Sequence, residues 1–154
     1  MQSAQLLIGD EWVSASDGST SETLDPATNT VTRTIALHGK EYPDPTYVAF
    51  DGHAVWVVAP TTGTVSRLDA QTGALTATTA VPGLALGLAF ADGSTWVTSF
   101  DPNRCSGNRC FSRLTRLDAR TARVIGKFGV DSPTGIGFGF GSLWIVDHRS
   151  ATVT

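Results

Sequence analysis

The stretch that decides the fold is Trp56-Val57-Val58-Ala59, followed by Thr64-Val65-Ser66-Arg67-Leu68-Asp69. Its tryptophan and its Leu-Asp pair recur along the chain. Tryptophan stands at positions 12, 56, 96 and 144. A Leu-Asp pair lies twelve residues after the first two tryptophans and twenty-one after the third, at Leu24-Asp25, Leu68-Asp69 and Leu117-Asp118. A large apolar residue precedes each tryptophan by six positions: Leu6, Phe50, Phe90 and Phe138. A repeat of about 40 residues indicates one supersecondary unit copied several times.

The second copy shows the composition of one unit. Short apolar or alternating segments predict four strands, at 47–50, 54–59, 64–68 and 74–81. Turn residues separate them, beginning with Asp51-Gly52-His53, where Asp-Gly favours a tight hairpin. Four strands of roughly five to six residues with their turns fill about 40 residues. We therefore predict an all-β fold made of four-stranded antiparallel blades, as in a β-propeller.

The repeat extends over residues 1–154, which we predict to be a single β-propeller segment. Three complete blades and a partial fourth are expected at about 4–37, 46–81, 84–129 and 133–154. Thr152-Val153-Thr154 align with Thr64-Val65-Ser66, so the fourth blade is expected to lack part of its third strand and its fourth. Three arrangements are open: a piece of a longer propeller, a half-propeller that forms a homodimer through open blade edges, or a small four-bladed ring.

The recurring residues have structural explanations. Each tryptophan, at 12, 56, 96 and 144, is expected in the core between neighbouring sheets, where its large apolar area stabilises the contact. Asp25, Asp69 and Asp118 each precede a threonine by three residues. Such an aspartate accepts hydrogen bonds from backbone N–H groups of a turn, so this motif closes a hairpin. A catalytic aspartate would not be needed in every copy.

The tryptophan segments resemble YVTN-type repeats. They are Trp96-Val97-Thr98-Ser99, Trp12-Val13-Ser14-Ala15 and Trp144-Ile145-Val146-Asp147, followed by the Leu-Asp-x-x-Thr turn where the chain reaches it. They are also similar to blades of virginiamycin B lyase-like and NHL-repeat propellers. The resemblance implies a propeller that serves as an enzyme, a sensor or a protein-binding platform. Lyase-type blades often carry an acid three residues after the aromatic, and here only Asp147 does.

Charge and hydropathy narrow the class of partner. The net charge of −3 argues against nucleic acid, and no apolar run approaches the ~20 residues of a membrane span. Met1–Asp10 does not have the pattern of a signal peptide. Six arginines between 104 and 123, opposed by one aspartate, give that window +5 and the remainder −8. We predict either a solvated strand face or a surface for an acidic partner, with Arg104, Arg109, Arg113 and Arg116 as candidates.

The two cysteines lie in the nine extra residues of the third copy. Cys105 and Cys110 are separated by four residues that include glycine and asparagine, which can bend enough for a disulfide. Zinc would need two further ligands, and none is near in sequence. We therefore expect a disulfide, with free thiols as the alternative. A disulfide would place the protein outside the cytosol.

Candidate ligand-binding residues come from the loops. His53 occupies a hairpin turn, and Asp147-His148-Arg149 is a run of acid, imidazole and guanidinium after an apolar strand. The sequence predicts a non-catalytic scaffold that binds a protein, a peptide or a small ligand. The alternative is part of a metal-dependent lyase- or lactonase-type propeller enzyme. No cofactor, metal or catalytic residue is assigned.

Overall fold

The computed structural model describes residues 5–8, 11–14, 20–25, 27–28, 30–37, 45–107 and 109–154. The chain divides into two compact units, Met1–Asp44 and Pro45–Thr154. Every helix or strand element in the described ranges is a β-strand, and all strand pairs are antiparallel. The predicted all-β fold of consecutive antiparallel sheets is therefore confirmed.

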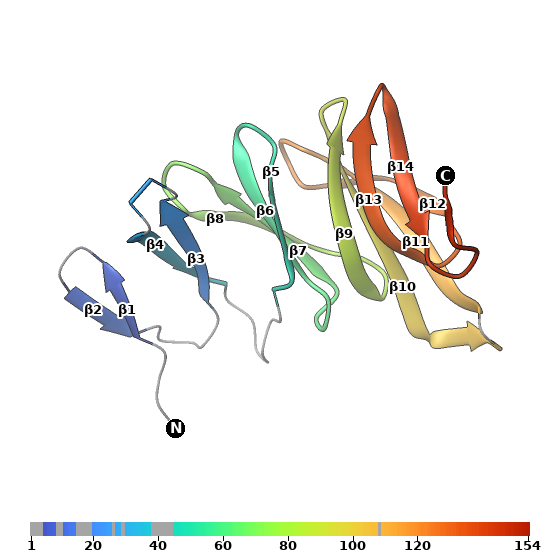
Figure 1. Cartoon of the computed structure of the whole chain (residues 1–154), viewed down its shortest axis with the longest axis horizontal. Helices are drawn as coiled ribbons and strands as arrows, with labels where there is room; N and C mark the ends of the chain where they lie inside the picture. Colours follow the sequence, from blue (N-terminus) through green and yellow to red (C-terminus); the bar gives the residue numbers. More distant parts are fainter. Residues whose placement is uncertain are drawn as a thin grey trace. The chain divides into compact units, whose positions relative to one another are not determined.

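The first sheet of the larger unit has the order β5-β6-β7-β8 (Figure 1). Its strands are Tyr47–Phe50, Ala54–Ala59, Thr64–Asp69 and Leu75–Ala80. They agree with the four strands predicted for the second copy to within one residue at each end. The turn residues of the sequence therefore fix where each strand stops.

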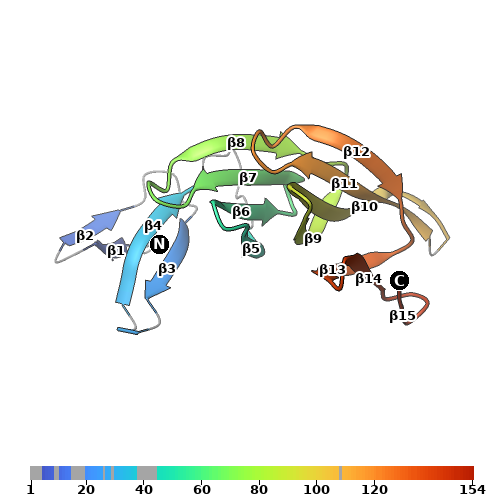
Figure 2. The same ribbon diagram turned by 90° about the horizontal axis from the view of Figure 1, so that it is seen from above.

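Two further sheets follow in the same unit. One has the order β12-β11-β10-β9, with strands Leu84–Ala91 (β9), Ser94–Ser106 (β10), Arg109–Asp118 (β11) and Val124–Gly129 (β12). The other has the order β13-β14-β15, with strands Pro133–Gly139, Ser142–Asp147 and Thr152–Val153. Within this unit, Figure 2 shows β5, β9 and β13 on the concave side and β8 and β12 on the convex side. Propeller blades have the same strand order, with the first strand of each blade on the inner side and the fourth on the outer side.

The smaller unit contains the four strands expected for the first copy, paired as two hairpins. They are Gln5–Ile8 (β1) with Glu11–Ser14 (β2), and Thr20–Asp25 (β3) with Thr30–Ala36 (β4). Leu6 pairs with Val13, the residue after Trp12, whereas Phe50 pairs with Val55, the residue before Trp56. The predicted equivalence of Leu6 and Phe50 is wrong, because only two residues connect β1 to β2.

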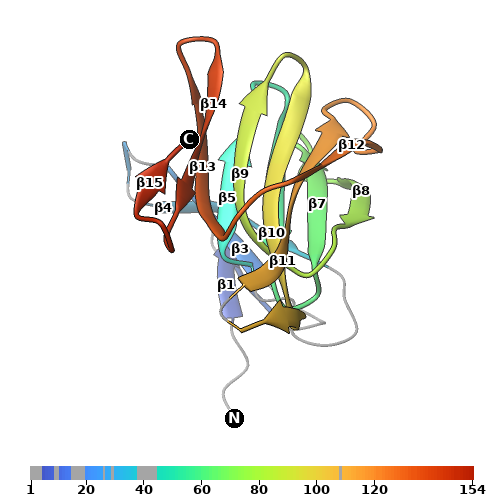
Figure 3. The ribbon, with the colours of Figure 1, turned by 90° about the vertical axis from the view of Figure 1, so that its right-hand side faces the viewer.

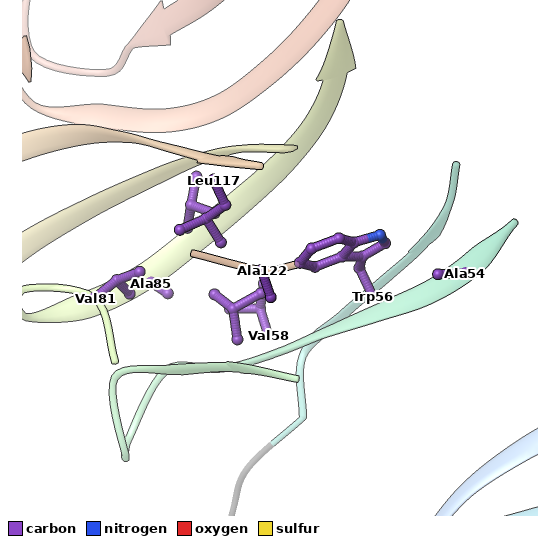
Figure 4. Close-up of a cluster of buried hydrophobic side chains, with 9 residues drawn as sticks. Ala54, Trp56, Val58, Val81, Ala85, Leu117 and Ala122 are labelled. Carbon is purple, nitrogen blue, oxygen red and sulfur yellow. The ribbon is translucent and has the colours of Figure 1, made fainter. Parts of the chain in front are cut away.

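The main core lies between the first two sheets of the larger unit. Trp56 on β6 is fully buried and belongs to a cluster with Val58, Leu117 of β11 and Ala122 of the β11–β12 turn (Figure 4). The Phe90 ring of β9 lies 6.4 Å from the Trp56 ring, centroid to centroid. Each sheet therefore covers an apolar face of the other, which neither could bury alone.

Two side chains of the first sheet also hydrogen-bond to the β11–β12 turn. Arg67 donates from Nε to the Ala119 carbonyl at 2.9 Å, and Thr79 donates from Oγ1 to the Ala122 carbonyl at 2.6 Å. The Arg67 guanidinium carbon lies 5.9 Å from the centroid of the Trp56 ring. These directional bonds fix the position of the turn against the apolar core.

The connection from the first sheet to the second passes close to the backbone of β10. Gly83, just before β9, has φ +76°, and an added Cβ would lie 2.2 Å from the Phe100 carbonyl oxygen. Both the backbone conformation and the lack of space therefore require glycine.

The inserted residues of the third copy lengthen the β10–β11 hairpin (Figure 3). The strand register shifts between Asp101 and Cys105, and Cys105 then pairs with Cys110 across the hairpin. Their sulfurs form a disulfide, with an S–S distance of 2.05 Å. The expected disulfide is thus present, and it is compatible with a location outside the cytosol.

Replacing Leu117 by alanine will destabilise the larger unit. Leu117 has no exposed surface, so truncation leaves a cavity and is expected to cost about 2–5 kcal/mol in the free energy of unfolding. Leu75, which is 38% exposed on β8, is the matched control, and its change to alanine should cost less than about 1 kcal/mol. Urea unfolding of both variants measures the difference, and equal losses would contradict the core described above.

The disulfide predicts the alkylation behaviour of the purified chain. With both cysteines paired, iodoacetamide should add nothing to the denatured, non-reduced protein and two groups after reduction. Intact-mass measurement reads the number of added groups. Two modified thiols before reduction would show that Cys105 and Cys110 are free.

Candidate functional site

A groove opens between the first two sheets of the larger unit, beside the β5–β6 and β9–β10 turns. Its volume is about 510 Å³, within the ~300–1,000 Å³ range of small-molecule sites. Its charged and titratable side chains are Asp51, His53, Arg67, Asp92 and Arg120, and its aromatic ones are Phe90 and Phe138. We call this the inter-sheet groove.

Asp51 anchors one wall of the inter-sheet groove. Its Oδ1 accepts the backbone N–H groups of His53 and Ala54 at 2.8 and 2.7 Å, and its Oδ2 accepts the indole N–H of Trp56 at 2.7 Å. Partial burial by itself would raise the pKa of Asp51. The hydrogen bonds from Ala54, Trp56 and His53, with the nearby charge of Arg67, outweigh it and hold the pKa below the ordinary 3.8. The charged carboxylate of Asp51 therefore links the β5–β6 turn to Trp56 in the core.

Arg67 brings a positive charge to the same wall. Nε donates to Ala119, and Nη1 donates to Thr76 Oγ1 at 2.9 Å. Its other terminal nitrogen has no hydrogen-bond partner among the described residues. Because three contacts, including the one to Trp56, fix the guanidinium, this nitrogen is a preorganised donor.

His53 and Arg120 are exposed at the mouth of the groove. In the part of the chain that the structure describes, neither side chain has a hydrogen bond or an ion pair; their backbone N–H groups donate to Asp51 and Asp118. Phe90 and Phe138 supply apolar walls. The exposed carboxylate of Asp92 lines the groove as well, so charges of both signs lie between aromatic sides. Such a lining suits a ligand that has a charged group on an apolar body.

The sequence located only one residue of this groove. The sequence predicts His53 as a ligand-binding candidate, whereas it assigns Asp51 to a turn and Arg67 to a strand. A clue was present: Asp51 stands five residues before Trp56, close enough across a hairpin to reach its indole. The equivalent residues of the next two copies are Ala91 and Gly139.

The other ligand candidates lie elsewhere. Asp147, with Arg149, lines a separate cavity of about 240 Å³, after the end of β14. His148 is exposed, with Nδ1 3.2 Å from the Ser132 carbonyl oxygen. His53 precedes the second strand of its sheet, whereas these residues follow the second strand of theirs. The two groups therefore lie at opposite ends of the strands (Figure 1).

Asp147 caps a turn. Its Oδ1 accepts the backbone N–H groups of Arg149 and Ser150 at 2.8 and 3.1 Å. The bond from the Ser150 N–H is the main cause that lowers the pKa of Asp147, and that from Arg149 adds to it. This carboxylate stabilises local backbone, as Asx turns do.

The recurrent aspartates Asp69 and Asp118 hold identical turns. In each, Oδ1 accepts the backbone N–H and the hydroxyl of the threonine three residues later, Thr72 or Thr121, with all four distances at 2.7 Å. These bonds lower the pKa of both carboxyls. The side chain of Asp25 lies outside the described residues.

The three described tryptophans have different surroundings. Trp56 is buried, and Trp96 is half-buried with its ring 5.8 Å from that of Phe128. Trp144 is 46% exposed, and its indole donates to the Gly139 carbonyl at 3.0 Å. The expected core position therefore applies to Trp56 and not to Trp144, because no sheet in the larger unit covers that face of β14. The side chain of Trp12 lies outside the described residues.

The candidate arginines divide between the two faces of their sheet. The guanidinium carbons of Arg104 and Arg113 lie 4.1 and 3.6 Å from the centroid of the Phe111 ring. Arg116, an odd number of residues from Arg113, points to the other face, 5.1 Å from the centroid of the Trp96 ring, and its Nε donates to Ser94. The side chain of Arg109 lies outside the described residues.

No group of three or more His, Cys, Asp or Glu side chains in the described ranges is placed to hold a metal ion. Nor does that part of the chain contain a helix with the length and apolar character needed to span a bilayer.

The fold defines an all-β protein whose sheets follow one another as propeller blades do. A structure of Kuenenia stuttgartiensis hydrazine synthase is similar, with a TM-score of 0.56 at 16% sequence identity. The match covers 77% of this chain and 37% of that chain, and it shows the fold alone. No family model and no curated protein matches the sequence.

Replacing Asp51 by asparagine is expected to lower the free energy of unfolding by about 1–2 kcal/mol at neutral pH, because hydrogen bonds to a charged acceptor are lost. A carboxyl with a lowered folded pKa stabilises above its unfolded value near 4, and this contribution disappears as the pH falls through the folded pKa. The difference between wild type and variant should therefore shrink below about pH 4.

Urea unfolding across an acid pH series measures this difference. Asp92→Asn is the control at neutral pH, because that exposed carboxylate accepts no hydrogen bond among the described residues. A wild-type advantage that stays constant down to the lowest pH would contradict the assigned role of Asp51.

Proposed function

We propose that the chain is a non-catalytic scaffold, of the YVTN- or NHL-like propeller kind that its repeats resemble, and that it binds a small or peptide ligand in the inter-sheet groove. The observation that carries the proposal is the groove itself. It joins the unpaired donors of His53, Arg67 and Arg120 to the aromatic walls of Phe90 and Phe138. Loops held by a rigid β framework are frequent binding sites.

The ligand class follows from this lining. Arg67 and Arg120 present guanidinium groups, whose N–H donors match a carboxylate. Phe90 and Phe138 favour an apolar or aromatic body beside that carboxylate. A carboxylic acid with an aromatic ring, such as N-acetylphenylalanine or the end of a peptide, satisfies both requirements.

Binding of N-acetylphenylalanine, followed by NMR chemical-shift changes, tests the proposal. Arg120→Ala should weaken binding about tenfold, because a charge-assisted hydrogen bond at the mouth is lost. Arg123→Ala is the matched control, since Arg123 is exposed in the same β11–β12 turn but does not line the groove. The amide of the same ligand should bind more weakly than the acid.

Two results would contradict the proposal. One is the absence of any shift change near the groove at millimolar ligand. The other is equal binding by Arg120→Ala and Arg123→Ala.

Pairing of two copies through an open sheet edge stays a separate prediction. The apolar side chains exposed on β12 to β15 are the surface on which this pairing would depend.

A further inference from the structure

The extended end of the β10–β11 hairpin carries a cluster of cations that the inter-sheet groove does not use. We call Arg104, Cys105, Cys110, Phe111 and Arg113 the cationic tip. Both guanidinium groups contact the Phe111 ring, at 4.1 and 3.6 Å. A guanidinium placed over an aromatic face keeps its N–H groups directed outward in its own plane. The tip therefore presents two sets of donors from one small area.

Within the described part of the chain, no carboxylate neutralises these two charges. Among the described residues, no ion pair within 4.0 Å involves Arg104 or Arg113, and the hydrogen bond from Arg113 goes to the Ser112 carbonyl. Two unpaired cations on the same ring repel each other. An anion that binds both would replace this repulsion by attraction, which favours an acidic partner.

The tip is also fixed and accessible. The disulfide of Cys105 and Cys110 closes the hairpin where the two strands pair, so little conformational freedom is lost on binding. Figure 1 and Figure 3 show the ends of β10 and β11 projecting beyond the neighbouring strands of the unit. Arg104 is exposed and Arg113 is half-buried.

The charge of the rest of the chain limits the size of the partner. Residues 104–123 carry +5, whereas the remainder carries −8. A long polyanion that extended past the tip would be repelled by the remainder, but a short acidic segment would contact only the tip. Guanidinium forks also match carboxylates in geometry. We propose that the cationic tip binds a short run of aspartate and glutamate side chains on a partner protein.

Fluorescence anisotropy with a labelled hexaglutamate peptide tests this proposal on the whole chain at low ionic strength. Arg104→Ala combined with Arg113→Ala should weaken binding by about tenfold. The matched control is Arg123→Ala with Lys127→Ala, which removes two exposed charges from the same sheet but away from the tip. Arg104→Ala alone, at an exposed position, provides a variant that is expected to fold. It should weaken binding severalfold, while added salt should weaken it further.

The disulfide gives an independent readout. Reduction should weaken hexaglutamate binding severalfold while the far-ultraviolet circular dichroism stays unchanged, because only the tip loses its cross-link. Equal binding by the tip variant and the control would overturn the proposal. It would also be overturned by tighter binding of a single-stranded oligonucleotide than of hexaglutamate, or by a hexalysine peptide that binds as well.

Discussion

The burial of Trp56 between two sheets is the constraint on which the rest of the larger unit depends. Its indole closes the apolar contact with Leu117 and Ala122, and its N–H is held by Asp51. Arg67 lies over the same ring and reaches the next sheet through Ala119. The inter-sheet groove therefore owes its shape to the core beneath it, because the residues that orient its polar wall also pack or bond to this tryptophan.

Equivalent positions in successive copies do not have equivalent surroundings. The residue five places before tryptophan is Asp51 in one sheet, Ala91 in the next and Gly139 in the last. The indole N–H accordingly bonds to a carboxylate, stays buried without a partner at Trp96, or bonds to a backbone carbonyl. Within the larger unit the strand pattern is thus repeated while the polar chemistry beside it varies, and among the sheets of that unit only the first builds a charged wall.

The sequence was sufficient for the four strands of the second copy, because alternating apolar residues and Asp-Gly or Asp-x-x-Thr turns act over short distances. It also placed the insertion and its two cysteines in one hairpin. The groove could not be predicted in the same way. Arg67 and Arg120 lie 53 positions apart in the sequence and share a cavity only because two sheets pack face to face. Similarly, the different register of the first copy depends on one short connection, which a fixed spacing of apolar residues does not reveal.

The close passage at Gly83 has a consequence for how such a chain can change over generations. The Trp56 face of the first sheet is filled by the second sheet, and the connection between these two sheets admits no side chain at Gly83, so duplication or loss of whole repeats preserves this packing. Exchange in the middle of a repeat exposes an indole and separates the glycine from the carbonyl that it must pass. Recombination between repeats is therefore tolerated at this junction, and point substitution in the turns is left to diversify the ligand chemistry.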